Sequence, residues 1–359
     1  MKTRYRATVA EINLKNLYSN YKNVSDRIGP DKIVIPVVKA NAYGHGVIEV
    51  VSYLVEKGID YFAVSLLEEA LEIREHYPKI RLLCMGVVEN DGLLIASENN
   101  IAVSMSNFDQ ITYVRELTIP LTIHIKVDTG MNRLGFKSDE DIKHAFSMLD
   151  RNPLIVIEGL YTHFSTADEN EDYYQFQLKR FFEVMTLLNY DFPMIHISNS
   201  SSQIKHEREF DFTTHTRLGI SLYGLTTDVE TKFLENTFTL KTKISQFNVL
   251  SPGEKLGYGA AYTATSNERI AVLPIGYADG FIRKNTGGDV EINHKRYPIV
   301  GRICMDQCFV RVDDTVTKDD DVILFGGIIS INEVAERLDT INYEIICDIT
   351  SRVPREYIK

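Results

Sequence analysis

The sequence predicts an α/β protein with an N-terminal (β/α)8 barrel of the TIM type and a C-terminal, mostly-β domain. From residue 31 to about 220, eight short apolar runs alternate with amphipathic helical stretches, as in a closed ring of parallel strands covered by helices. After about residue 235, strands of mixed polarity are separated by turns rich in Gly and Pro. We therefore divide the chain into residues 1–235 and 236–359, and we expect the first few residues to join the β domain.

The eight predicted barrel strands share a nearly continuous apolar character, which is typical of strands buried on both faces. They are Ile33–Val38, Tyr61–Ser65, Ile80–Met85, Ile101–Met105, Leu121–Val127, Leu154–Tyr161, Met194–Ile197 and roughly Thr216–Ser221. Between them, apolar residues at helical spacing predict helices, the clearest being Val47–Lys57, Leu66–Tyr77, Asp139–Leu149 and Glu171–Leu188. Before the first strand, Asn13 is expected to cap a helix that stops at Gly29.

The second domain is predicted from strands of alternating or mixed polarity at Leu240–Val249 and Asp289–Val300. Turns at Ser251-Pro252-Gly253 and Thr286-Gly287-Gly288 separate strands there. Within this domain only Ser330–Leu338 has a convincing helical pattern.

Composition excludes several classes of protein. A net charge of −11 argues against nucleic acid or another polyanion as the main partner. No apolar run reaches membrane-spanning length, and the first residues contain no apolar signal segment. Four scattered cysteines indicate reduced thiols and a cytoplasmic protein. Cys304 and Cys308 are spaced poorly for zinc, and we expect no metal.

Reactive side chains lie at the ends of the predicted strands or directly after them, where a barrel builds its active site from the βα loops. In chain order they are Lys39, Lys126, His163, Asn199 with Ser200, and Arg217 with Gly219 and Ile220. Phosphate sites in barrels commonly use the loops after strands seven and eight, where small residues expose backbone N–H groups. The run Asn199-Ser200-Ser201-Ser202 and the segment Leu218-Gly219-Ile220 suit that task.

Lys39 ends a buried apolar strand and leaves two interpretations open. Its ammonium could extend out of the barrel mouth into water. Alternatively, a lysine of lowered pKa could form a Schiff base with a carbonyl compound. The small residues and the tyrosine of Ala40-Asn41-Ala42-Tyr43-Gly44 favour the second interpretation, because they suit a bound cofactor that carries phosphate.

Several motifs resemble those of the alanine racemase family, in the same order along nearly the whole chain. They are VVKANAYGHG, KVDTGMNRLGF, HFSTADE, HISNSS, RLGISLYG, LGYGAAYTA, GYADG, GRICMDQ and RVPR. The resemblance implies a homodimeric enzyme that interconverts L- and D-alanine with pyridoxal 5′-phosphate (PLP), and that supplies D-alanine for peptidoglycan.

By this resemblance, Lys39 carries PLP as an aldimine and then serves as the base for the α-proton of the D-enantiomer. Tyr258 of the partner subunit is expected to be the base on the L-face. Two bases are needed because a single fixed base would mostly return the proton to the face it came from. A phenol has a reference pKa of about 10, so such a base needs cationic neighbours, and His163 bound to Arg217 would supply them.

The resemblance also assigns the groups around the cofactor ring. Arg217 would donate to the pyridine nitrogen, with His196 as its support, and would leave that nitrogen unprotonated. Arg133 would bind the phenolic oxygen of PLP and the substrate carboxylate. Lys126 would be carbamylated by CO2 and orient Arg133, although a salt bridge to Asp128 or another carboxylate remains the alternative.

The remaining assignments concern the phosphate and the substrate. The phosphate would be held by Tyr43, Asn199, Ser200, Gly219 and Ile220. From the partner subunit, Met305 and Asp306 would meet the substrate carboxylate, and Tyr277 would narrow the entrance.

The chain departs from the family pattern at Ser351, directly before Arg352-Val353-Pro354-Arg355. The family typically places a tyrosine there that touches the phosphate and crowds the substrate side chain. We therefore expect a larger pocket that also admits serine, unless a neighbouring side chain fills the space. Two other interpretations are an amino-acid decarboxylase of the same architecture and a PLP carrier without turnover, but the motifs from LGYGAAYTA onward favour a racemase.

Overall fold

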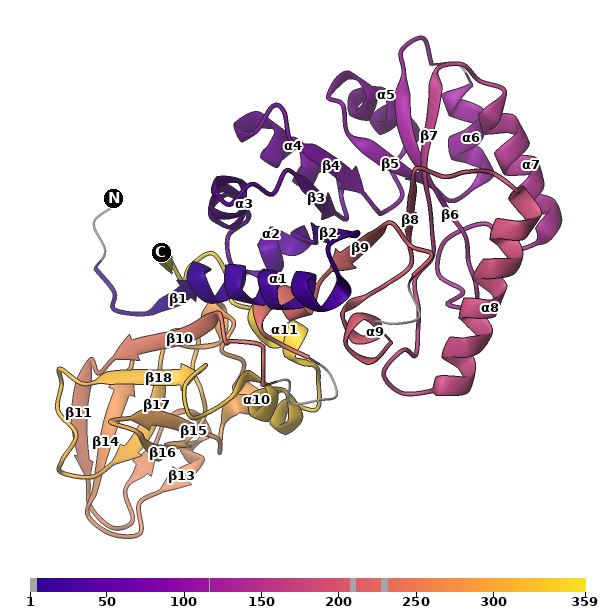
Figure 1. The fold of residues 1–359 in the computed structure, drawn as a ribbon. Coiled ribbons are helices and arrows are strands. Elements are labelled where there is room, and N and C mark those ends of the chain that lie inside the picture. Colours follow the sequence, from indigo (N-terminus) through magenta and orange to yellow (C-terminus); the bar gives the residue numbers. More distant parts are fainter. Residues whose placement is uncertain (1–4, 116, 207–210, 227–231) are drawn as a thin grey trace.

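The computed structural model describes residues 5–115, 117–206, 211–226 and 232–359. Its barrel contains eight parallel strands (Figure 1), in agreement with the predicted fold class. They are β2 (Ile33–Pro36), β3 (Tyr61–Val64), β4 (Arg81–Cys84), β5 (Ala102–Met105), β6 (Leu121–Lys126), β7 (Ile155–Tyr161), β8 (Met194–His196) and β9 (His215–Leu218). Strands β3 to β8 pair in sequence order, and β2 pairs with β9. A bridge between Val37 and Ala63 and a 3.1 Å hydrogen bond from Thr214 N–H to the carbonyl of Ile195 join these two sheets into a ring.

Helices alternate with the barrel strands as predicted. They are α1 (Leu14–Ile28), α3 (Val47–Glu56), α4 (Leu67–His76), α5 (Asn90–Glu98), α6 (Phe108–Val114), α7 (Asp139–Asp150), α8 (Glu171–Leu188) and α9 (Ser200–Lys205). The side chain of Asn13 caps α1 by accepting from the N–H of Asn16, and the helix stops at Gly29, whose φ of 104° suits glycine. Both ends of this helix are therefore where the sequence predicted them.

The last barrel strand is shorter than expected. We predicted a strand over roughly Thr216–Ser221, but β9 ends at Leu218 and the chain continues as a 3-10 turn, η2 (Ile220–Tyr223). This turn places Gly219 and Ile220 in the loop at the barrel rim and not in the sheet.

The second sheet has nine strands in the order β11-β14-β17-β16-β15-β18-β10-β1-β19. They are β1 (Val9–Asn13), β10 (Phe238–Lys243), β11 (Gln246–Leu250), β14 (Glu268–Leu273), β15 (Asp289–Ile292), β16 (Lys295–Val300), β17 (Cys308–Val312), β18 (Asp321–Phe325) and β19 (Arg355–Ile358). A small hairpin of β12 (Lys255–Leu256) and β13 (Tyr262–Thr263) extends from it. Strand β1 comes from the N-terminus, and it pairs antiparallel with β10 and parallel with β19.

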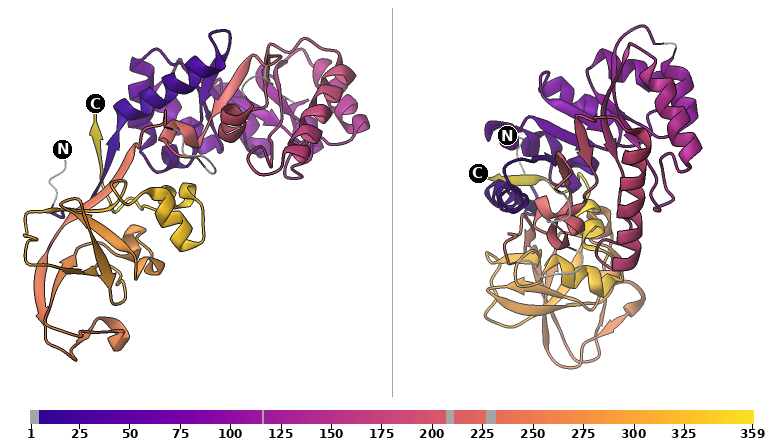
Figure 2. Two further views of the ribbon diagram at one scale, coloured as in Figure 1. Left: turned by 60° about the horizontal axis from the view of Figure 1, so that its bottom comes forward. Right: turned by 45° about the vertical axis from the view of Figure 1, so that its right-hand side comes forward.

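The predicted strand segments of this β domain each prove to be two strands. Leu240–Val249 spans parts of β10 and β11, and Asp289–Val300 is the β15–β16 hairpin. The predicted helix is α10 (Ile331–Leu338), but a second helix, α11 (Asn342–Cys347), was not predicted. Figures 1 and 2 show both helices between the sheet and the barrel, where α11 contacts the turn that follows β2.

That turn, α2 (Lys39–Tyr43), is wound in the left-handed sense, with φ between 51° and 54° from Ala40 to Tyr43. This conformation costs about 1–2 kcal/mol for each residue with a side chain, so it needs support. The N–H of Ala40 donates to Glu69 Oε1 over 2.6 Å, and the side chain of Asn41 accepts from the N–H of Val47 over 2.8 Å.

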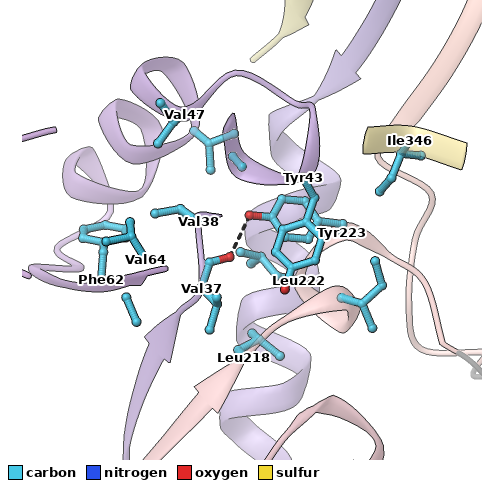
Figure 3. Packing of buried hydrophobic residues seen from close by; sticks show 14 of the residues in the cluster. Val37, Val38, Tyr43, Val47, Phe62, Val64, Leu218, Leu222, Tyr223 and Ile346 are labelled. Atoms are coloured by element: carbon cyan, nitrogen blue, oxygen red, sulfur yellow. Dashed lines mark hydrogen bonds between the residues drawn. The ribbon is translucent and has the colours of Figure 1, made fainter. Parts of the chain in front are cut away.

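Apolar packing supports the turn from below (Figure 3). The ring of Tyr43 lies 4.7 Å from the ring of Tyr223, whose hydroxyl donates to the carbonyl of Val37 over 2.9 Å. The turn therefore fixes the backbone on both sides of Lys39. Among the described residues, no helix combines the length and the apolar character needed to cross a membrane.

Candidate active site

Four basic side chains meet where the barrel strands end. Lys39 follows β2, Lys126 ends β6, Arg133 lies in the loop after β6, and Arg217 is on β9. Burial, and then the charge of Arg133, lower the pKa of Lys39 from its usual value, and Glu69 partly opposes this effect. A lysine amine of lowered pKa is a better nucleophile and base near neutral pH.

Lys126 is buried with its side chain 6% exposed. Burial, followed by the charges of Arg133 and Arg217, lowers its pKa to about 8. The salt bridge to Asp128 that we left open is absent among the described residues. Instead, Oδ1 of Asp128 accepts hydrogen bonds from the N–H groups of Gly130 and Asn132.

Arg217 is buried and held by several acceptors. Its Nη1 lies 2.6 Å from Nδ1 of His196, and Nη2 donates to the carbonyl of Thr162 over 2.9 Å. A longer contact of 3.4 Å joins Nη2 to Nδ1 of His163. Burial, and then the charge of Arg217, hold the pKa of His163 well below its usual value, so this ring is neutral at neutral pH. The predicted contacts of His163 and His196 with Arg217 are therefore present.

Hydroxyl groups converge next to Gly219 and form a cradle for an anion. A Cβ atom placed on Gly219 would lie 3.3 Å from Oγ of Ser200 and 3.4 Å from the hydroxyl of Tyr43. The buried Oγ of Ser221 has no hydrogen-bond partner among the described residues, although buried hydroxyls are normally paired. The chemistry of this set fits a phosphate group, because each hydroxyl can donate to an oxygen of the anion.

Asn199 and Ile220 position the backbone next to this cradle, and their side chains do not face it. The side chain of Asn199 accepts from the N–H of Ser202 at the start of α9, and its amide donates to the carbonyl of Phe164. Ile220 is buried and begins η2. The predicted phosphate residues come from three loops: Asn199 and Ser200 follow β8, Gly219 and Ile220 follow β9, and Tyr43 follows β2.

The predicted site residues of the β domain are not brought to Lys39 within one chain. Tyr258, in η3 (Tyr258–Ala260) between β12 and β13, is 71% exposed, and Figure 1 shows β13 at the side of the β domain away from the barrel. Tyr277 and Met305 are also exposed. Asp306 accepts from Arg352 Nη2 over 2.6 Å on the surface.

Ser351 lines a cavity of about 360 Å³ together with Ala40, Asn41, Gly44 and Cys347 of the same chain. The described residues that line this cavity do not include Lys39, Tyr43 or Ser200.

Sequence reasoning missed two groups near this site. The carboxylate of Glu69 accepts from the N–H of Leu66 at the start of α4 and from the N–H of Ala40 in the turn after Lys39. In the sequence, only its position in the first turn of a helix pointed to such a capping role. His124 and Glu158 lie behind Arg217; His124 stands between two isoleucines in β6, and Glu158 is the charged residue of the otherwise apolar β7. Such a polar residue in a buried strand is a signal that could have been followed.

The fold and the site fit the class of barrel enzymes that use a phosphate-bearing cofactor. Two family models match the chain: the alanine racemase N-terminal domain over residues 12–227, and the alanine racemase C-terminal domain over residues 237–357. The chain belongs to the alanine racemase family, as its motifs indicated, and this family consists of PLP-dependent isomerases.

Relatives agree over the full length of the chain. An alanine racemase of Geobacillus stearothermophilus is 38% identical over 99% of this chain and 94% of its own length. Alanine racemase 1 of Bacillus subtilis shows the same identity and coverage. The crystal structure of alanine racemase from E. faecalis superposes with a TM-score of 0.93 at 34% identity, covering 98% of both chains. A Bacillus anthracis alanine racemase with bound L-Ala-P gives a TM-score of 0.93 at 34% identity, covering 99% of this chain and 96% of that one.

Proposed function

We propose that this protein interconverts L- and D-alanine with PLP bound at Lys39. The observation that carries the proposal is the position of Lys39, whose pKa is lowered, at the same rim as the hydroxyl cradle around Gly219. The cradle suits the phosphate of PLP, and the surrounding cations suit the carboxylate of an amino acid. When bound, PLP delocalises the negative charge left at Cα after the α-proton departs.

The side chains of this protein move and guide the proton. The amine of Lys39 removes or returns it on the D-face. With PLP bound, Arg217 would donate an N–H toward the pyridine nitrogen, and Arg133 would bind the phenolic oxygen of the cofactor and the substrate carboxylate. The phosphate is bound by Tyr43, Ser200 and the loop of Gly219 and Ile220. Asn199 holds the start of α9 in place beside them.

The second base is Tyr258 of the partner subunit, so the active enzyme is a homodimer with two shared sites. Two facts support this part of the proposal. Tyr258 is 71% exposed and belongs to η3, next to β13, which Figure 1 shows at the side of the β domain away from the barrel. Tyr277 and Met305, proposed to border the substrate, are exposed in the same domain. In the dimer, Met305 and Asp306 meet the substrate carboxylate, and Tyr277 narrows the entrance.

Lys126 is proposed to carry a carbamate that orients Arg133. Carbamylation requires a neutral amine, and a pKa of about 8 makes a fraction of the amine neutral near neutral pH. The product is an anion placed among cations, which favours its retention.

The proposed substrate range includes serine as well as alanine. A serine at position 351 is shorter than a tyrosine by several ångströms, so it leaves free the volume that a tyrosine side chain would fill. A hydroxymethyl group has room there, and the hydroxyl of Ser351 or a water can bind it.

The cellular role and location follow from the proposed reaction and from the cysteines. D-alanine made by such an enzyme would supply peptidoglycan synthesis. A cytoplasmic location remains a prediction from the four cysteines, which are all free thiols.

Deuterium incorporation at Cα of both alanine enantiomers in D2O tests the proposed reaction. A racemase exchanges this proton in both enantiomers and interconverts them. A decarboxylase would release CO2, and a carrier would do neither. Lys39→Ala serves as the control and should incorporate no deuterium above background.

A further inference from the structure

A path of hydrogen bonds crosses the inside of the barrel from Arg217 to Glu158. Nη1 of Arg217 is 2.6 Å from Nδ1 of His196, and Nε2 of His196 is 2.8 Å from Nδ1 of His124. Nε2 of His124 is 2.9 Å from Oε2 of Glu158. At the far end, Arg81 Nη2 donates to the other carboxylate oxygen over 2.8 Å. Arg81 begins β4, so this end lies at the barrel rim opposite the active site.

The protons on this path can be placed from the chemistry of its members. Burial, and then the charge of Arg217, hold the pKa of His196 well below its usual value, and burial lowers the pKa of His124. Both rings are therefore neutral, with one N–H each. Arg217 can only donate, so His196 accepts at Nδ1 and carries its proton on Nε2. His124 then accepts at Nδ1 and donates from Nε2 to the carboxylate. Every bond from Arg217 to Glu158 points the same way.

The path also connects a buried cation to a distant anion. Among the described residues, Arg217 bonds to three backbone carbonyls and two histidine rings, none of which carries a negative charge. A buried cation without a counter-charge costs several kcal/mol. Although burial opposes ionisation of Glu158, the hydrogen bond from His124 and the charge of Arg81 keep its pKa below the usual value. Glu158 is thus the anion at the end of the path.

The backbone is adapted to this arrangement. Ile123 pairs with Ile157 and His124 pairs with Gly159, so Glu158 is the extra residue of a bulge between β6 and β7. Bulges redirect side chains in this way. A Cβ atom on Gly159 would lie 2.2 Å from Nδ1 of His124, so only glycine leaves room for the ring in its present position.

We propose that Glu158 is a positioning residue for the racemase reaction. It holds His124 and His196 in a single proton arrangement and thereby fixes the orientation of Arg217. This inference rests on the proposed function, in which Arg217 faces the pyridine nitrogen of PLP. Without an obligatory acceptor at position 158, His196 can present an N–H to Arg217, and two donors then face each other.

Glu158→Gln in the holoenzyme tests this role, because a carboxamide has only one oxygen. Arg81 and His124 bind different oxygens of Glu158, so in the same geometry one of them would face the N–H2 group of the glutamine. An N–H2 group turned toward His124 reverses the path. We expect kcat to fall about tenfold or more in both directions, with KM changed by less than about threefold, and the absorption band of bound PLP to shift. Glu333→Gln is the matched control, because it removes a surface ion pair with Arg296 and should change none of these quantities.

Arg81→Met added to Glu158→Gln separates positioning from simple structural damage. With the competing donor removed, the carboxamide oxygen at position 158 is free to accept from His124. We expect the double variant to recover at least about threefold in kcat over Glu158→Gln. If Glu158 only stabilised the fold, removing its ion-pair partner as well would recover nothing.

NMR of histidines labelled with nitrogen-15 reads the proton positions without turnover. In the wild-type holoenzyme, His124 and His196 should both be protonated at Nε2, and Glu158→Gln should change this pattern. A proton on Nδ1 of either ring in the wild type would overturn the proposed path. If the wild type is active and Glu158→Gln has the same kcat, PLP spectrum and histidine proton positions, the positioning role is overturned, and the proposed function is not. A wild type without racemase activity would overturn the proposed function and, with it, the role of Glu158 in that reaction.

Discussion

The side-chain nitrogen of Lys126 lies 5.4 Å from the centre of the Tyr161 ring. Tyr161 therefore provides a π face but no counter-charge, and Arg133 and Arg217 add to the burial that lowers the lysine pKa to about 8. At this pKa roughly one amine in ten is neutral at pH 7 and about half at pH 8. Because only the neutral amine reacts with CO2, carbamate formation should rise with pH over this range.

Carbon-13 NMR of enzyme equilibrated with labelled bicarbonate should show a carbamate signal that grows from pH 7 to pH 8. Lys126→Ala should lack the signal. Lys241→Ala should keep it, because Lys241 is ion-paired with Glu11. An active wild type that shows no such signal with CO2 supplied would contradict carbamylation of Lys126.

Mixed dimers should reveal shared active sites. Lys39→Ala and Tyr258→Phe should each be nearly inactive, since each removes one base from both sites. When the two are refolded together in equal amounts, half of the dimers are mixed and hold one intact site each, so about a quarter of wild-type activity should return. Lys39→Ala mixed with the double variant Lys39→Ala/Tyr258→Phe is the control and should recover nothing. Heterodimers that form but remain inactive would rule out the shared site.

The two bases should act on opposite enantiomers. Tyr258→Phe should slow the loss of the α-proton from L-alanine about 100-fold or more, and affect D-alanine far less. Deuterium exchange at Cα measures both directions separately. Tyr5→Phe, which alters another highly exposed tyrosine, should leave both rates unchanged. Equal losses for the two enantiomers in Tyr258→Phe would contradict the assignment.

Removing a hydroxyl from the cradle should weaken cofactor binding. Tyr43→Phe deletes a donor to the phosphate, and hydrogen bonds to charged groups contribute about 1.5–3 kcal/mol. The dissociation constant for PLP, measured by titrating cofactor-free enzyme, should rise about tenfold or more. Tyr53→Phe alters a buried tyrosine outside the site and should bind PLP as the wild type does. Unchanged affinity in Tyr43→Phe would remove this hydroxyl from the phosphate site.

The side chain at position 351 should set substrate size. Ser351→Tyr should lower kcat/KM for L-serine relative to L-alanine by about tenfold, since small differences in pocket volume discriminate by about 1–3 kcal/mol. Ser165→Tyr, at an exposed serine in the loop after β7, serves as a comparison for adding a tyrosine elsewhere. A serine-to-alanine ratio that stays the same in Ser351→Tyr would show that another side chain limits the pocket.

Much of the barrel could be predicted because its strands are apolar on both faces and its helices carry local end signals, such as Asn13 and Gly29. The left-handed turn from Ala40 to Tyr43 could not be predicted, because alanine does not favour this conformation and its support comes from Glu69 and from packing against α11. The split of Leu240–Val249 into two strands was missed for a related reason. Pairing of β10 with β1 depends on residues more than 200 positions away.

In the site, too, features set by local sequence could be predicted, and features set by distant residues could not. Motifs and strand ends predicted which residues of the barrel meet, including His196 beside Arg217. The hydrogen-bond path to Glu158 needs the register between β6 and β7, and a bulge at this point shifts that register by one residue. A pattern in one strand contains no information on such a shift, because it depends on the neighbouring strand.

Strand β1 has a consequence for how the chain reaches its final form. It lies between β10 and β19 in the second sheet, so residues as far apart in the sequence as Ala10 and Arg355 must meet before that sheet is complete. During synthesis the eight barrel strands, which end at Leu218, have all emerged long before Arg355–Ile358 leave the ribosome. Until then β1 has an unpaired edge, which is prone to association with other chains. Folding of the second sheet is therefore timed by the synthesis of Arg355–Ile358.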